Sequence, residues 1–63
     1  MNIKMRCWVV LLRNEMAVRL RPISQYTDEQ IAMALEIAQQ RLGEKAGYEA
    51  LRTWLVENER EAA

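Results

Sequence analysis

The first 21 residues contain no glycine and no proline, and they are rich in large apolar side chains. Read with the 3.6-residue period of an α-helix, the larger apolar side chains gather on about a third of the circumference. Cys7, Val10, Leu11 and Val18 then form a second apolar face. A helix that is apolar nearly all round is expected to be buried, and two further short helices are expected to be too few to cover it. The segment therefore predicts that a second copy of the chain completes the core.

The same segment has a second interpretation, as a β-hairpin. Residues 16–21 alternate apolar and polar side chains, as a half-buried strand does. Such a hairpin has to turn near Arg13–Glu15, where the glycine that hairpin turns usually need is missing. The missing turn signal favours a helix over about residues 5–20, which Pro22 would end.

Signals for both ends of a helix enclose residues 28–42. Thr27 and Gln30 have the spacing of a capping box, and the two acidic residues between them lie at the positive end of the helix dipole. Gly43 suits the left-handed position that ends many helices. A third, amphipathic segment follows the turn Gly43–Gly47 and predicts a helix over about 47–61. A connection of about five residues predicts an antiparallel hairpin of these two helices.

A chain of 63 residues forms one domain, residues 1–63, with a thin core. Small chains usually gain stability from disulfides, a metal or a partner subunit. The single cysteine allows no intramolecular disulfide, and without histidine the chain offers a poor set of zinc ligands. No apolar run is long enough for a membrane helix. We therefore expect a cytoplasmic, self-associating protein without metal, cofactor or membrane contact.

The predicted fold is all-α, with three short helices at about 5–20, 28–42 and 47–61 in an intertwined homodimeric bundle. The first helices are expected to pack against the partner chain. The alternative is a ββαα or ribbon-helix-helix-like fold with residues 6–21 extended. In the all-α fold, core and dimer interface share one set of apolar residues: Met5, Trp8, Val9, Leu12, Met16, Leu20, Ile31, Leu35, Leu42, Leu51, Trp54 and Leu55.

Enzymatic reaction centres are hard to assemble from these residues. Without histidine there is no Ser-His or Cys-His pair. Cys7 lies in an apolar run and is expected to be a small buried hydrophobe. Gly43 and Gly47 are expected in a turn between helices, not in a phosphate-binding loop. We therefore expect a protein that is not an enzyme and has no catalytic residue.

The charge is unevenly divided, although the net charge is zero. Residues 1–26 carry five basic side chains against Glu15, a balance of +4, and residues 27–63 carry −4. Such asymmetry is typical of a nucleic-acid face, or of two halves that attract each other in an oligomer. If residues 16–21 form a strand, Arg19 and Arg21 lie on its outward side and are the candidate DNA contacts of a dimeric ribbon-helix-helix repressor.

The 63-residue frame and the capped segment Tyr26–Leu35 resemble the small early proteins of lambdoid phages that are encoded between the exonuclease and excisionase genes. The resemblance implies a helical, self-associating regulator that is made early in infection. Such a regulator influences phage development or the host cell cycle by contacting a host protein. The predicted function is thus a phage-type accessory regulator acting by protein–protein contact, with an unidentified protein partner. The alternative is the DNA-binding repressor, and an antitoxin-like inhibitor is the third interpretation.

Overall fold

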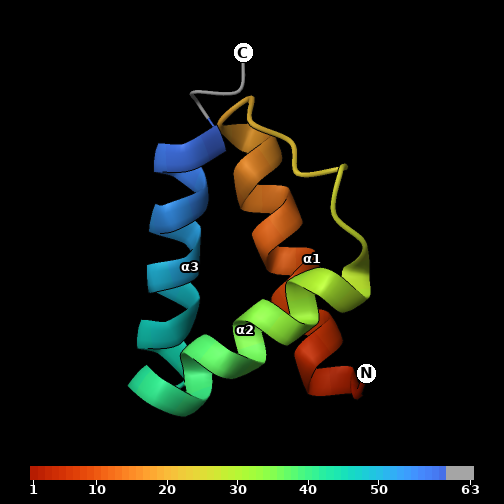
Figure 1. The fold of residues 1–63 in the computed structure, drawn as a ribbon. Coiled ribbons are helices and arrows are strands. Elements are labelled where there is room, and N and C mark those ends of the chain that lie inside the picture. Colours follow the sequence, from red (N-terminus) through yellow and green to blue (C-terminus); the bar gives the residue numbers. More distant parts are fainter. Residues whose placement is uncertain (60–63) are drawn as a thin grey trace.

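Three helices make up the fold of residues 1–59, the part of the chain that the computed structural model describes. They are α1 (Ile3–Val18), α2 (Asp28–Leu42) and α3 (Glu44–Glu59) (Figure 1). No residue of this part lies in a strand. The all-α prediction is confirmed, and the alternative with residues 6–21 extended is wrong. The predicted end of the third helix, at residue 61, lies outside the described residues.

Local caps set both ends of α1. The Asn2 side chain accepts a hydrogen bond of 2.7 Å from the backbone N–H of Met5, so the helix begins two residues earlier than predicted. At the other end, Leu20 takes a φ of 59°. The N–H of Leu20 donates to the carbonyl of Ala17 and that of Arg21 to the carbonyl of Met16, both at 2.9 Å. These two bonds form a Schellman motif, and they end α1 at residue 18, before Pro22 is reached.

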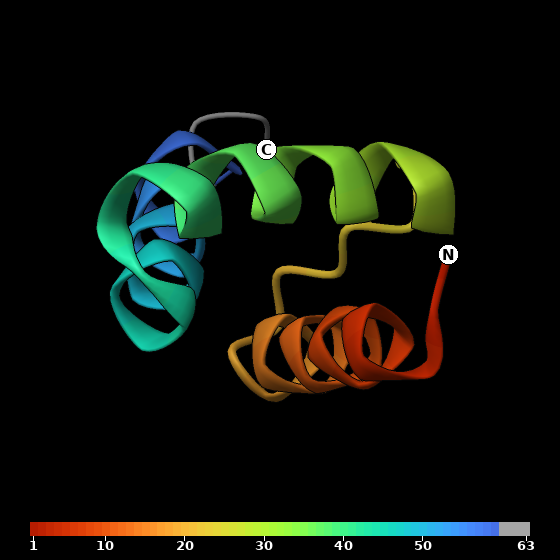
Figure 2. The same cartoon turned by 90° about the horizontal axis from the view of Figure 1, so that it is seen from below.

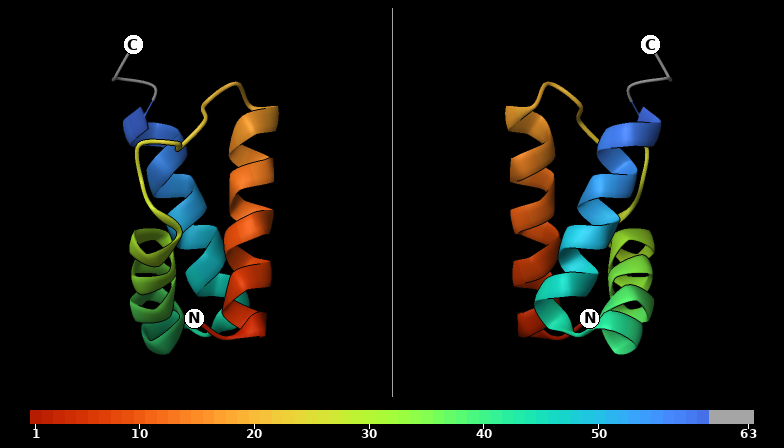
Figure 3. Two further views of the ribbon diagram at one scale, coloured as in Figure 1. Left: turned by 90° about the vertical axis from the view of Figure 1, so that its right-hand side faces the viewer. Right: turned by 90° about the vertical axis from the view of Figure 1, so that its left-hand side faces the viewer.

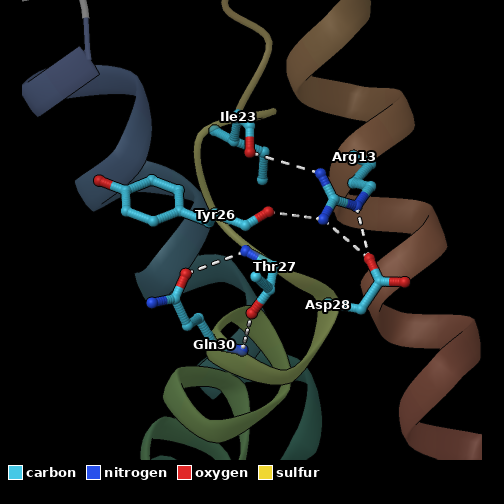
Figure 4. A network of polar contacts seen from close by, with 6 residues as sticks. All are labelled: Arg13, Ile23, Tyr26, Thr27, Asp28 and Gln30. Carbon is cyan, nitrogen blue, oxygen red and sulfur yellow. Dashed lines mark hydrogen bonds and ion pairs between the residues drawn. The ribbon is translucent and has the colours of Figure 1, made fainter.

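The predicted capping box begins α2. The N–H of Gln30 donates to Oγ1 of Thr27 (3.1 Å), and the N–H of Thr27 donates to Oε1 of Gln30 (2.9 Å) (Figure 4). Gly43 ends α2 as predicted and has a positive φ of 98°, but its ψ of 163° is extended. The chain therefore enters α3 at once, at Glu44 and not at residue 47. The connection is a single residue.

The predicted antiparallel hairpin of α2 and α3 is wrong. Figures 1 and 3 show α1 and α3 running side by side in the same direction, while α2 crosses both steeply. Gly47, expected in the turn, lies in the first turns of α3. A Cβ on Gly47 would stand 2.5 Å from the Cα and N of Gln39. The helices approach this closely at their crossing because residue 47 has no side chain.

The core lies between the three helices and the loop that joins α1 to α2. The expectation that α1 finds no cover within its own chain is wrong for its inner face. Val9, Leu12 and Met16 are buried by α2, α3 and the loop. In the part of the chain that the structure describes, the buried apolar residues are Val9, Leu12, Met16, Ile23, Ile31, Leu35, Tyr48 and Leu55, and Met5, Trp8 and Leu51 are among the partly buried residues that pack against them.

Three members of the predicted shared core are exposed on the single chain. Leu20 is 88% exposed, because it follows the early end of α1. Leu42 lies at the corner where α2 ends, and Trp54 borders a pocket. That a second chain covers these side chains stays a prediction.

Arg13 fastens the loop to α1. Its guanidinium donates to the carbonyls of Ile23 (3.3 Å) and Tyr26 (2.8 Å) (Figure 4). It also pairs with the carboxylate of Asp28, with Nε 2.9 Å and Nη2 2.8 Å from Oδ1. These bonds hold the loop so that Ile23, outside any helix, enters the core.

Candidate protein-binding surfaces

A polar cluster of Glu15, Tyr48 and Arg52 joins α1 to α3. Tyr48 donates its hydroxyl hydrogen to Glu15, and Arg52 donates to both carboxylate oxygens of Glu15, at 3.1 and 3.0 Å. Trp8 closes one side, with its ring centroid 5.0 Å from that of Tyr48. The guanidinium carbon of Arg52 stands 5.4 Å from the Tyr48 centroid, within the range of a cation–π contact.

The cluster is built to hold two helices together. The hydrogen bond from Tyr48, together with Arg52, lowers the pKa of Glu15. Burial and the Glu15 carboxylate raise the pKa of Tyr48 far above its usual value. Both shifts move titration away from neutral pH, so the pair is unsuited to proton transfer at pH 7. Within residues 1–59, no buried side-chain nitrogen or oxygen lacks a hydrogen-bond partner.

The side of α1 turned away from α2 and α3 is apolar and open. Ile3 is 83% and Val18 81% exposed, and Val10 and Leu11 are about half exposed. Cys7, predicted to be buried, is also exposed here. We call this surface the outer face of α1; it consists of Ile3, Cys7, Val10, Leu11, Asn14, Ala17 and Val18, none of which is charged.

Most charged side chains of α1 bond within their own chain. Lys4 pairs with Glu44 at 2.5 Å, Arg13 with Asp28 and Glu15 with Arg52. The usual surface helix turns its apolar side inward and its charges outward. In α1 the inner and the outer face are both apolar, and the charged side chains lie between them. The outer face is therefore an apolar surface that another molecule can contact.

A second apolar feature is a pocket between α2, α3 and the loop. It has a volume of about 260 Å³. Trp54 at its edge is 53% exposed, and Figure 4 shows the ring of Tyr26 directed from the loop toward α3. The pocket is lined by Tyr26, Gln30, Ile31, Ala34, Leu51, Trp54 and Leu55. Ligand sites for small molecules usually occupy about 300–1,000 Å³, so this pocket suits a protruding side chain.

The arginines proposed for DNA contact lie at the end of α1 and not on a strand. Arg19 follows the last helical residue, and its guanidinium donates to the carbonyl of Glu15 at 2.9 Å. Arg21 is half-buried in the loop. The β-ribbon on which the ribbon-helix-helix interpretation depends is therefore helical through Val18.

Residues 1–59 place no group of three or more His, Cys, Asp or Glu side chains where they could hold a metal ion. No helix in this part is long and apolar enough to cross a bilayer. Comparison with protein-family models, curated proteins and solved structures gives no match. The candidate binding sites are the two apolar surfaces, the outer face of α1 and the pocket.

Trp54 was predicted to belong to the core, but Tyr26 and Gln30, which line the pocket together with Trp54, were not predicted to lie near it. The sequence signal for the pocket was Tyr26, an aromatic residue directly before the helix cap Thr27.

The outer face of α1 was not predicted as a separate surface, although Cys7, Val10, Leu11 and Val18 were predicted to share one face of the helix.

Proposed function

We propose that this chain is a small phage-type accessory regulator, without catalytic activity, that acts in the host cytoplasm by binding another protein. It works as a homodimer. The observation that carries the proposal is the half-exposed Trp54 beside an apolar pocket. Tryptophan in or beside a pocket is a common anchor of protein interfaces, and such anchors contribute most of the binding energy.

The two apolar surfaces suit two kinds of contact. The outer face of α1 is long and uncharged, which suits self-association. The pocket combines aromatic rings of Tyr26 and Trp54 with the amide of Gln30. An apolar centre with a few polar groups is typical of interfaces between different proteins. The pocket is therefore the surface that we assign to the protein partner.

The DNA-binding alternative has less support. Of the five basic side chains in residues 1–26, Lys4, Arg13 and Arg19 are bonded within the chain. A nucleic-acid surface needs basic groups that are free to contact phosphates. The antitoxin-like inhibitor is a special case of protein binding, and the same surface would serve it.

The test compares wild-type protein with Trp54→Ala and a matched control, Met33→Ala, in which an exposed apolar side chain of α2 outside the pocket is removed. Photo-crosslinking from position 30 in infected or host cells identifies the bound protein, which is then purified for titration. We expect Trp54→Ala to weaken that binding about tenfold or more, equivalent to about 1.4 kcal/mol. Met33→Ala should bind as the wild type does, and both variants should keep the helical circular dichroism spectrum.

Equal binding by Trp54→Ala and wild type would contradict the assignment of the pocket. Binding of duplex DNA that weakens steeply with salt, and with Arg21→Ala, would instead support the repressor.

A further inference from the structure

Building on the homodimer in the proposed function, we propose that the outer face of α1 is its interface. Two α1 helices pack in parallel about a two-fold axis, so that Asn14 of one copy faces Asn14 of the other. Figure 2 shows that nothing in the described chain lies beyond α1 on the side away from α2 and α3. A second copy can therefore approach this face without rearranging the first.

The spacing of the outer face is that of a coiled-coil seam. Ile3, Cys7, Val10, Asn14 and Ala17 follow one another at alternating intervals of four and three residues. This spacing repeats every 3.5 residues on average and keeps a seam turned toward a partner helix. Leu11 and Val18 widen the seam on one side. The inner-face residue Leu12 lies opposite, in the core of its own chain.

The absence of charge from the seam favours a second copy over a different protein. A two-fold axis brings identical side chains together, so a seam carrying charges of one sign would repel itself. Of the basic side chains that flank the seam, Lys4 and Arg13 are neutralised within their own chain by Glu44 and Asp28, and the exposed Arg6 lies at the edge of the seam and not within it. The outer face is therefore complementary to itself.

Asn14 selects the parallel orientation. Its amide is both donor and acceptor, so two asparagines facing each other can form hydrogen bonds with one another. One buried asparagine in an apolar seam is a known means of fixing register and a two-stranded state. In an antiparallel pair Asn14 would face an apolar residue, and its amide would be buried without a partner, which is unfavourable.

The size of the seam indicates a dimer that dissociates on dilution. A helix of 16 residues is about 24 Å long, and one helix pair of that length falls at the small end of specific interfaces, below about 1,200 Å². We therefore expect dimer at high concentration and monomer at low concentration, with the fold of each chain unchanged.

The test is sedimentation equilibrium of the full chain over a concentration series, for wild type, Val10→Glu and the control Met33→Glu. Val10 and Met33 are both exposed on the single chain, so neither glutamate should disturb the monomer fold. Val10→Glu should weaken dimerisation by at least about tenfold, since two like charges meet at the seam, whereas Met33→Glu should dimerise as the wild type does. Val18→Glu, at a second exposed position, repeats the test if Val10→Glu lacks a helical spectrum.

The orientation has its own readout, because the parallel register places Cys7 opposite Cys7. Mild oxidation with diamide should then link wild-type dimers by a disulfide, for which the Cα atoms must come within about 7 Å, while Val10→Glu should remain mostly unlinked. Dimers that form but do not cross-link would overturn the parallel register. A dimer that survives both glutamates would overturn the interface alone, and a wild-type monomer at all concentrations would overturn the homodimer too. None of these results bears on partner binding by Trp54.

Discussion

Tyr48 on α3 donates its hydroxyl hydrogen to Glu15 on α1, joining residues 33 positions apart in the chain. Arg52, one turn further along α3, donates to the same carboxylate. The Lys4–Glu44 ion pair and the contact between the Trp8 and Tyr48 rings also join these two helices. The polar cluster therefore contributes to how α1 and α3 lie relative to each other.

Replacing Tyr48 by phenylalanine should destabilise the protein while keeping its aromatic packing. The hydroxyl is lost and Glu15 keeps Arg52 as its partner, so the expected loss is about 1.5–3 kcal/mol, as for hydrogen bonds to charged groups. Urea unfolding followed by circular dichroism measures the change. A free energy of unfolding equal to that of wild type would show that the bond contributes nothing.

Stability should be greatest between weakly acidic and weakly alkaline pH. The pKa of Glu15 is lowered in the fold, from an ordinary value of 4.5, first by the Tyr48 hydrogen bond and then by Arg52. This contribution is present above pH 4.5 and is lost as the pH falls through the folded-state pKa. The pKa of Tyr48 is raised from 10.0 by burial and by Glu15, so its contribution is present below pH 10.0 and is lost as the pH rises further.

The Tyr48→Phe variant separates the two limbs of this pH profile. The alkaline decrease should disappear, since the ionising group is gone, and the acid decrease should become smaller. Urea unfolding at a series of pH values provides the measurement. An alkaline decrease of unchanged size in Tyr48→Phe would assign it to another group.

Leu20→Gly should stabilise the protein although it removes a large apolar side chain. Leu20 has a φ of 59° and is almost fully exposed, so its side chain contributes little packing, while its backbone conformation disfavours any residue with a Cβ. Relief of that strain should raise the free energy of unfolding by about 0.5–1 kcal/mol. Thermal unfolding at low protein concentration measures the effect. A lower melting temperature would indicate that Leu20 packs against something in solution.

Gly47→Ala should destabilise the protein, opposite to the usual effect of this substitution in a helix. At an open helical position alanine is favoured over glycine by about 1 kcal/mol. Here the new Cβ would meet the backbone of Gln39 at 2.5 Å, so α2 and α3 must separate, at a cost of about 1–3 kcal/mol. The control Ala46→Gly, at the exposed neighbouring position, measures the propensity difference in the same turn. A stabilised Gly47→Ala would show that the crossing is looser than described.

Elements defined by local signals were predictable from the sequence. The capping box at Thr27 and the glycine at position 43 enclose α2, because both depend only on adjacent residues. The start of α3 was missed because it depends on the extended ψ of Gly43, for which the sequence carries no sign. The close contact at Gly47 is equally a property of the assembled helices.

The core was predictable only where it lies on helices. The helical period identified a set of core residues that are indeed buried on the inner faces of the helices: Val9, Leu12, Met16, Ile31, Leu35 and Leu55. Ile23 was missed because it lies in a loop, where no period applies, and Arg13 holds it in place. Apolar residues on two sides of α1 pointed to a partner chain, but the sequence did not separate the side used within the chain from the side left open.

The proposed dimer interface on the outer face of α1 is tested most directly by an isotope-filtered NOE experiment on a mixture of ¹³C-labelled and unlabelled chains at high concentration. This measurement detects contacts between two copies and excludes those within one copy. We predict intermolecular contacts among the methyl groups of Ile3, Val10 and Leu11, with Leu12 and Met16 showing contacts within their own chain alone. Intermolecular contacts from Leu12 or Met16 would contradict this interface. So would the absence of intermolecular contacts from the outer face of α1 in a sample shown to be dimeric.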